Sequence, residues 1–127
     1  MNILRQNKSP RYQRDGITSY LLVSKNTCAS ENLAITIVEM EPGGVQNLHS
    51  HEPEQMYYIL DGSGLMSVDG EESPVQAGDS IFFPPSVVHG LKNTGEGVLR
   101  YLSAASPSFT VAQCETWWPL APFESDP

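Results

Sequence analysis

The chain has 127 residues, a mass of 13.9 kDa and a formal net charge of −8. This length suits one domain with a single hydrophobic core, which we assign to residues 1–127, and argues against two domains. The first 25 residues carry five bases and one acid, whereas the remainder carries fourteen acids and two bases. Nucleic acid is a poor partner for such an acidic surface.

Residues 1–24 are predicted to form an N-terminal arm or strand. This start has no apolar run like that of a secretory signal, and no stretch of about 18 apolar residues is available to cross a bilayer. Cys28 and Cys114 are far apart and have no CxxC neighbour, which indicates buried or half-buried thiols rather than a zinc ribbon. We therefore expect a cytoplasmic protein with reduced thiols and no membrane partner.

From residue 17 onward, short runs of alternating apolar residues are separated by turn residues. The predicted strands cover 17–24, 33–40, 55–60, 65–68, a run ending at 75, 80–83, 89–92 and 98–104. Asp69-Gly70 between two of these runs is a strong hairpin signal. Strands at intervals of about eight to twelve residues predict an all-β sandwich or barrel, and no segment has convincing helical periodicity.

We assign the barrel body to residues 33–104 and a C-terminal tail to residues 105–127. The tail contains Trp117 and Trp118 and is too apolar for a plain disordered end. It is expected to pack across the domain or onto a partner subunit.

All three histidines of the chain, His49, His51 and His89, are candidate metal ligands. In an extended strand residues i and i+2 point to one face, so His49 and His51 could reach a single point. Imidazole is a common ligand of zinc, copper, iron and nickel. Taken alone, a His-x-His pair is more often an exposed polar loop, but the pattern around it favours a metal site.

Two spaced motifs contain these histidines. The first is Gly43-x5-His49-x-His51-x3-Gln55-x6-Gly62 and the second is Gly78-x5-Pro84-x-Ser86-x2-His89-x3-Asn93. In this order they resemble the two motifs of the cupin superfamily, except that Gln55 replaces a Glu and Ser86 replaces a Gly. The resemblance covers roughly residues 33–102. It implies a single-domain cupin, that is, a jelly-roll barrel or double-stranded β-helix. This barrel would bind one divalent transition metal (Zn, Fe, Mn or Ni) through His49, His51, Gln55 and His89. Asn93 is expected to cap a turn.

Gln55 makes the implied ligand set neutral, because an amide oxygen replaces a carboxylate. Such a site keeps the full +2 charge of the ion and should be a stronger Lewis acid than a site with Glu. The set of three His and one Gln resembles that of small cupin enzymes that open the ring of 4,5-unsaturated uronates, and of certain polyketide cyclases. Residues 98–103 do not reproduce the charged residues of the uronate enzymes, so the substrate stays open.

Three further residues are candidates for catalysis. If Gln55 points inward, alternation places Tyr57 on the same face, where it is either a general acid or hydrogen-bond donor or plain core. On the last strand, either Arg100 or its neighbour Tyr101 points inward, and Arg100 would bind a carboxylate with its planar fork or lie on the surface. Glu39 is either a general base in the cavity or a solvated residue at its rim.

The favoured function is a metalloenzyme that acts on a small polar metabolite, carboxylate or sugar-like, by isomerase, lyase or ring-opening chemistry. One alternative is a metal-dependent dioxygenase of the cupin type. Another is a non-catalytic module that binds or senses a small molecule. Cupins of this size commonly pair through an N-terminal strand added to the partner's sheet, so the resemblance also implies a homodimer, with residues 1–24 and the Trp117-Trp118 tail as interface candidates.

Overall fold

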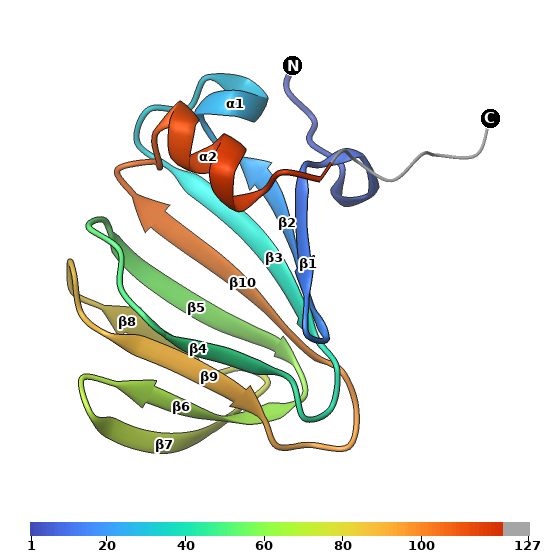
Figure 1. The fold of residues 1–127 in the computed structure, drawn as a ribbon, viewed down its shortest axis with the longest axis vertical. Coiled ribbons are helices and arrows are strands. Elements are labelled where there is room, and N and C mark those ends of the chain that lie inside the picture. The colour runs from blue at the N-terminus through green and yellow to red at the C-terminus, as the bar shows by residue number, and fades with distance from the viewer. Residues whose placement is uncertain (121–127) are drawn as a thin grey trace.

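A computed structural model describes residues 1–120, and residues 121–127 lie outside the described part of the chain. Two antiparallel sheets face each other (Figure 1). The first sheet has, in spatial order, β1 (Arg11–Arg14), β2 (Ile17–Val23), β3 (Ala34–Met40), β10 (Leu99–Ser106), β5 (Glu54–Asp61) and β8 (Ser80–Phe83). The second sheet has β4 (Val45–His49), β9 (His89–Asn93), β6 (Ser63–Val68) and β7 (Glu71–Gln76). The chain is therefore a mostly β protein with the expected jelly-roll architecture.

The predicted strands from residue 17 onward are all present, with ends that differ by at most two residues. The structure adds β4 and also β1, which pairs with β2 through a turn at Asp15 and Gly16, both of which have positive φ. The hairpin signal is also confirmed, because Asp69 and Gly70 have φ values of 50° and 82° between the paired strands β6 and β7. Positive φ at both turn residues matches the twist of the flanking strands.

The N-terminal strands belong to the chain's own sheet. β2 pairs with β3 along most of its length, from Ile17 opposite Met40 to Val23 opposite Ile35. β1 forms one edge of this sheet. Among residues 1–120, no helix is long and apolar enough to cross a membrane.

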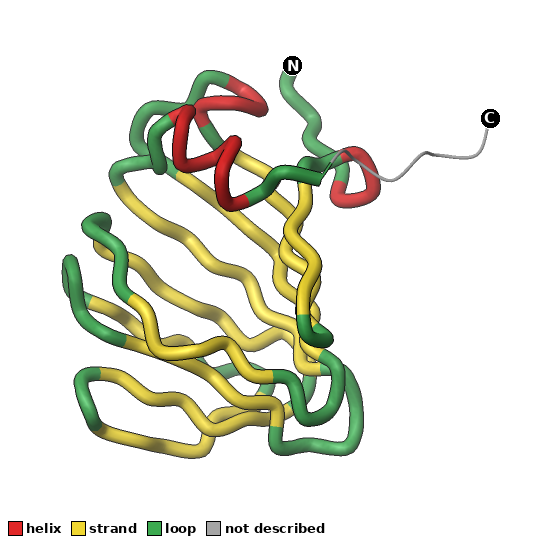
Figure 2. The backbone as a smooth tube through the Cα atoms, viewed as in Figure 1, coloured by secondary structure: helices red, strands yellow, loops and turns green. Residues whose placement is uncertain are grey.

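Two short α-helices were not predicted from the sequence, α1 (Lys25–Cys28) and α2 (Val111–Trp117). Each begins at a capping residue: the Ser24 hydroxyl accepts from the Thr27 amide at 3.1 Å, and Thr110 and Gln113 form a reciprocal capping box. Both helices lie at the same end of the molecule (Figure 2). Segments this short contain too few turns for a helical period to appear in the sequence.

The buried side chains form two clusters. The main core, between the two sheets, consists of Ile17, Val38, Met40, Tyr57, Ile59, Met66, Val75, Phe83, Leu91, Leu99 and Tyr101. A smaller core under the helices consists of Leu21, Ala34, Ala105, Phe109 and Cys114, with Trp117 and Trp118 packed against it. Cys28 is half-buried and Cys114 is buried, and both are free thiols as expected.

Asn93 performs the turn-capping role expected from its motif. Its side-chain amide donates to the carbonyl oxygens of Met40 and Gly97, both at 2.9 Å, and its Oδ1 accepts from the Gly95 amide at 3.0 Å. The side chain thereby joins the end of β3 to the turn that leads into β10. These hydrogen bonds hold the end of β9 against β3 and the following turn.

Candidate metal centre

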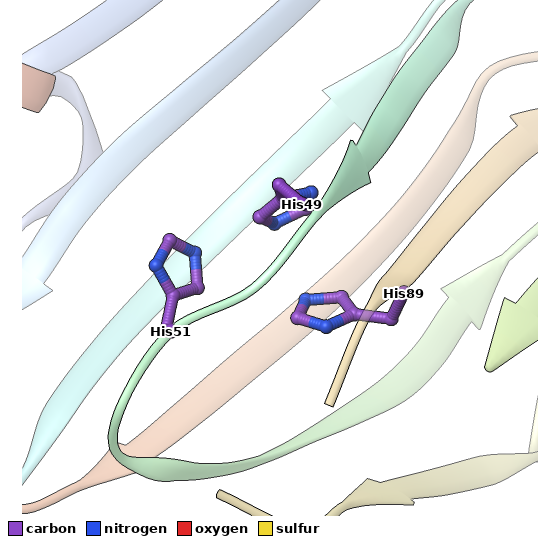
Figure 3. Close-up of side chains that lie close together, drawn as sticks. All are labelled: His49, His51 and His89. Atoms are coloured by element: carbon purple, nitrogen blue, oxygen red, sulfur yellow. The ribbon is translucent and has the colours of Figure 1, made fainter. Parts of the chain in front are cut away.

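Three histidines converge on one point of the structure (Figure 3). His49 ends β4, His51 lies in the loop that follows, and His89 begins β9 directly opposite His49. The ring centroid of His49 is 4.8 Å from that of His51 and 4.3 Å from that of His89. One potential ligand atom from each ring lies within 4.8 Å of the others. The two-residue spacing thus brings His49 and His51 together, although His51 lies in a loop and not in the predicted strand.

The loop that carries His51 is held by the second motif. The Ser86 amide donates to the His51 carbonyl oxygen at 2.7 Å. Ser86 has a φ of 63°, a conformation that favours glycine, which is the residue usual at this motif position. The Ser86 turn therefore positions a ligand from the other motif.

Backbone carbonyls orient two of the imidazoles. His49 Nδ1 lies 2.7 Å from the Asn47 carbonyl oxygen, and His89 Nδ1 lies 3.1 Å from that of Val87. A carbonyl can only accept, so each Nδ1 carries the proton and each Nε2 keeps a free lone pair. His89 Nε2 is buried and has no hydrogen-bond partner among the described residues.

Gln55 is oriented by Ser103. The Gln55 Nε2 donates to Ser103 Oγ at 2.8 Å, and both side chains are buried. The amide oxygen is then turned away from Ser103, and it too is buried without a hydrogen-bond partner in the described part of the chain. Buried acceptors are rarely left unpaired, because the loss of hydration is costly. Gln55 Oε1 and His89 Nε2 therefore fit a bound cation.

Burial keeps the three imidazoles neutral. It lowers the pKa of His49, and it lowers the pKa of both His51 and His89 to about 4, with repulsion from neighbouring imidazoles adding to the effect. At neutral pH all three rings therefore present lone pairs, as metal ligation requires.

We expect the metal-free protein to lose stability as the pH falls from about 6.5 toward about 4. In this window the unfolded chain binds protons that folded His51 and His89 do not bind, because their folded pKa is about 4 and the ordinary value is 6.5. Acidification therefore favours unfolding. The prediction is tested by measuring the urea concentration at the unfolding midpoint at about pH 7 and at about pH 5. The drop in midpoint should be smaller in a His51→Gln/His89→Gln variant, and an equal drop would contradict the prediction.

A cavity of about 450 Å³ opens beside the histidines. Its walls include His49, His51, Gln55 and Ser103, and the buried side chains of Tyr57 and Tyr101 also line it. Tyr57 is 2% exposed, and its ring centroid is 5.8 Å from that of His89. Burial raises the pKa of Tyr57 to about 12, so its phenol is protonated at neutral pH. The predicted alternation is confirmed for Gln55, Tyr57 and Ile59, which all point inward.

Glu39 and Arg100 lie on the opposite face of the first sheet and do not line the cavity. They are register partners on β3 and β10, and the Arg100 Nε is 3.6 Å from Glu39 Oε2. Gln6 joins both side chains, since its Oε1 accepts from Arg100 at 3.1 Å and its Nε2 lies 3.5 Å from Glu39. Tyr101, the other candidate on β10, takes the inward position. Among the described residues, Glu39 and Arg100 therefore pair with each other and do not line the cavity.

Four residues of the site were missed in the sequence. Ser103 could have been found, because it alternates with Tyr101 on β10 and so shares its face. Phe109, Trp117 and Trp118 reach the cavity from α2 and the residues on either side of it. The apolar tail was noticed, but no local pattern indicated where it would pack.

Comparison with known proteins gives a family and a fold. The oxalate-binding protein of Thermotoga maritima is 34% identical over 83 residues, which are 65% of this chain and 69% of that protein. Dimethylsulfoniopropionate lyase DddW of Ruegeria pomeroyi is 31% identical over 88 residues, 69% of this chain but only 58% of the relative. The structure of KdgF from a Halomonas species matches with a TM-score of 0.74 at 20% identity, over 86% of this chain and 96% of that one.

The family match covers residues 36–105, which is more than half of the chain. This segment contains both motifs in full and all four candidate ligands. The chain therefore belongs to the Cupin_2 family of cupin domains.

Proposed function

We propose that the chain is a metal-dependent enzyme whose ion is held by His49, His51, Gln55 and His89. The observation that supports it most is the pair of buried, unpartnered acceptors, Gln55 Oε1 and His89 Nε2, beside two further imidazoles. A divalent ion bound there would act as a Lewis acid on a carbonyl or hydroxyl oxygen. Zinc, iron, manganese and nickel are all compatible with a nitrogen and oxygen ligand set.

The chain's own residues favour isomerase, lyase or ring-opening chemistry. Gln55 adds no negative charge, and because its amide nitrogen donates to Ser103, its amide oxygen stays free to act as a ligand. Tyr57 is protonated at neutral pH and lines the cavity, so its phenol can donate a hydrogen bond or a proton to a substrate oxygen. Apolar side chains, including Ile17 and Val38, also line the cavity.

The relatives support a small molecule as the substrate. One is an oxalate-binding protein and another is a dimethylsulfoniopropionate lyase, and both names refer to small molecules. A small oxygen-bearing metabolite would fit the volume of the cavity and the ligand set beside it.

Elemental analysis followed by turnover assays tests this proposal. Protein purified without an affinity tag should contain about one divalent ion per chain. The loaded protein is then incubated with small hydroxy acids, keto acids and unsaturated uronates, with and without oxygen. Turnover that does not need oxygen supports the proposal, and turnover that consumes oxygen would replace it with a dioxygenase. Binding without product would indicate a sensor or binding module, and the absence of any bound metal would refute the metal centre.

The homodimer stays a prediction, and the structure suggests a surface for testing it. On the outer face of the first sheet, Tyr58 is 41% exposed and Phe82 is 59% exposed on the adjacent strands β5 and β8. Sedimentation equilibrium should give twice the 13.9 kDa mass of one chain. If this face is the interface, Phe82→Glu should shift the population toward monomer, because a charge there would be buried. A monomeric wild-type protein would contradict the prediction.

A further inference from the structure

One wall of the cavity is made of aromatic side chains from the C-terminal segment. We call Phe109, Trp117 and Trp118 the aromatic wall; all three line the same cavity as His49, His51 and Gln55. The wall touches the candidate metal centre directly, since the ring centroid of His51 is 5.0 Å from that of Trp117 and 5.3 Å from that of Phe109. Any molecule bound through its oxygens at the histidines would therefore lie beside these rings.

The aromatic wall is held in place by the chain itself. Phe109 and Cys114 are buried in the smaller core, and the capping box of Thr110 starts α2. At the other end, the indole Nε1 of Trp118 donates to Ser19 Oγ at 2.9 Å, and Leu120 exchanges two backbone hydrogen bonds of 3.1 Å with Arg11. The rings are thus positioned before any ligand arrives, which reduces the entropy lost on binding.

The wall nevertheless leaves apolar surface uncovered. Phe109 is buried, but Trp117 and Trp118 are only half-buried, and both line the cavity. The contacts within the wall are edge-on or tilted, with Phe109 5.3 Å from Trp117 and 5.7 Å from Trp118. Half-buried indole rings on a concave surface are typical of a site for a flat apolar group.

The charged side chains around the cavity limit how many charged groups a ligand can carry. Apart from histidine, the charged side chains among its described lining residues are Arg14 and Asp15. These two lie 3.7 Å apart, and their side chains are 67% and 81% exposed. Arg14 is therefore solvated and already beside an acid, and the described walls offer no buried cation to balance a second carboxylate.

From these observations we infer that the cavity takes a small aromatic compound with two neighbouring oxygen donors and no second charged group away from them. The oxygens face the histidines and Gln55, and the ring lies against Trp117 and Phe109. This inference rests on the proposed metal centre and narrows its substrate class from polar metabolites in general. A compact dianion such as oxalate would leave the aromatic wall unused.

The inference can be tested with two chelators that differ only in their apolar part. Benzohydroxamate and acetohydroxamate bind a metal through the same two oxygens, but only the first carries a ring. We expect benzohydroxamate to bind the metal-loaded protein about tenfold more tightly, after correction for the affinities of both compounds for the free ion. Trp117 and Trp118 are the chain's two tryptophans, so quenching of intrinsic fluorescence reports binding at the wall itself.

A matched pair of variants assigns the effect to the wall. Trp117→Leu should reduce the preference for the aromatic chelator to about twofold or less while metal content is unchanged. Val111→Ala, at a 47% exposed position at the start of α2, should keep the preference. Equal affinity of the two chelators for metal-loaded wild-type protein would overturn the inference even if Trp117→Leu fails to fold. A preference that persists in folded Trp117→Leu would overturn it as well. Failure of the metal centre itself would be seen separately, as a lack of bound ion in wild-type protein, and would overturn both proposals.

Discussion

Replacing both His49 and His89 by alanine is expected to abolish stoichiometric binding of a divalent ion. The two residues face each other across β4 and β9, and their rings are 4.3 Å apart. Removing both leaves His51 in a loop and Gln55 on another strand, too few ligands to enclose an ion. Because changes to groups that merely support metal ligands cost about 10- to 100-fold in affinity, loss of two ligands should weaken binding by more than about 100-fold. Elemental analysis and metal titration measure the effect.

The matched control for this experiment is Glu54→Ala. Glu54 is an exposed acid next to Gln55 in sequence, but it points to the opposite face of β5. If the ion is bound by inward-facing groups, Glu54→Ala should retain about one ion per chain. Loss of metal in this variant, or retention in the double histidine variant, would show that the ligands lie elsewhere. Circular dichroism on both variants separates loss of ligands from loss of the fold.

The largest effect on stability is expected from Gly64→Ala, about 2 to 3 kcal/mol of destabilisation. Gly64 lies on β6 opposite Asn93 of β9, between two paired strands. An added Cβ would collide with the Lys92 carbonyl oxygen, and it would lie 2.7 Å from Leu99 Cδ1. The carbonyl belongs to the backbone of a paired strand and cannot move without disturbing β9, which carries His89.

Gly97→Ala is the matched control, because an added Cβ there would meet no atom within 4 Å. Urea unfolding of the metal-free proteins, followed by tryptophan fluorescence, should give a midpoint for Gly97→Ala close to that of the wild type. Similar midpoints for Gly64→Ala and Gly97→Ala would mean that β9 can shift to make room for the added Cβ, and the packing argument would then be wrong.

Much of the barrel could be predicted from local patterns. Alternation along β5 correctly placed Gln55 and Tyr57 on the inner face, and Asp69-Gly70 correctly marked a hairpin. These features depend on two-residue periodicity and on the φ preferences of turn residues, which are properties of short segments. The four candidate ligands were chosen differently, through the resemblance of the two motifs to those of cupins, and the structure brings the three histidines among them together.

Two features of the site were decided only by the tertiary structure. The pairing of β10 with β5 shifts between Arg100 and Tyr101, and it is Tyr101 that faces the cavity while Arg100 pairs with Glu39 outside. The aromatic wall depends on Cys114 and Phe109 being buried against β2, β3 and β10. A helix of this length is marginal by itself and is stabilised by such packing. The sequence by itself determined which residues alternate and where the chain turns, because these are local properties. Which face of a strand looks inward, and what closes the cavity, depended on contacts between segments far apart in the chain.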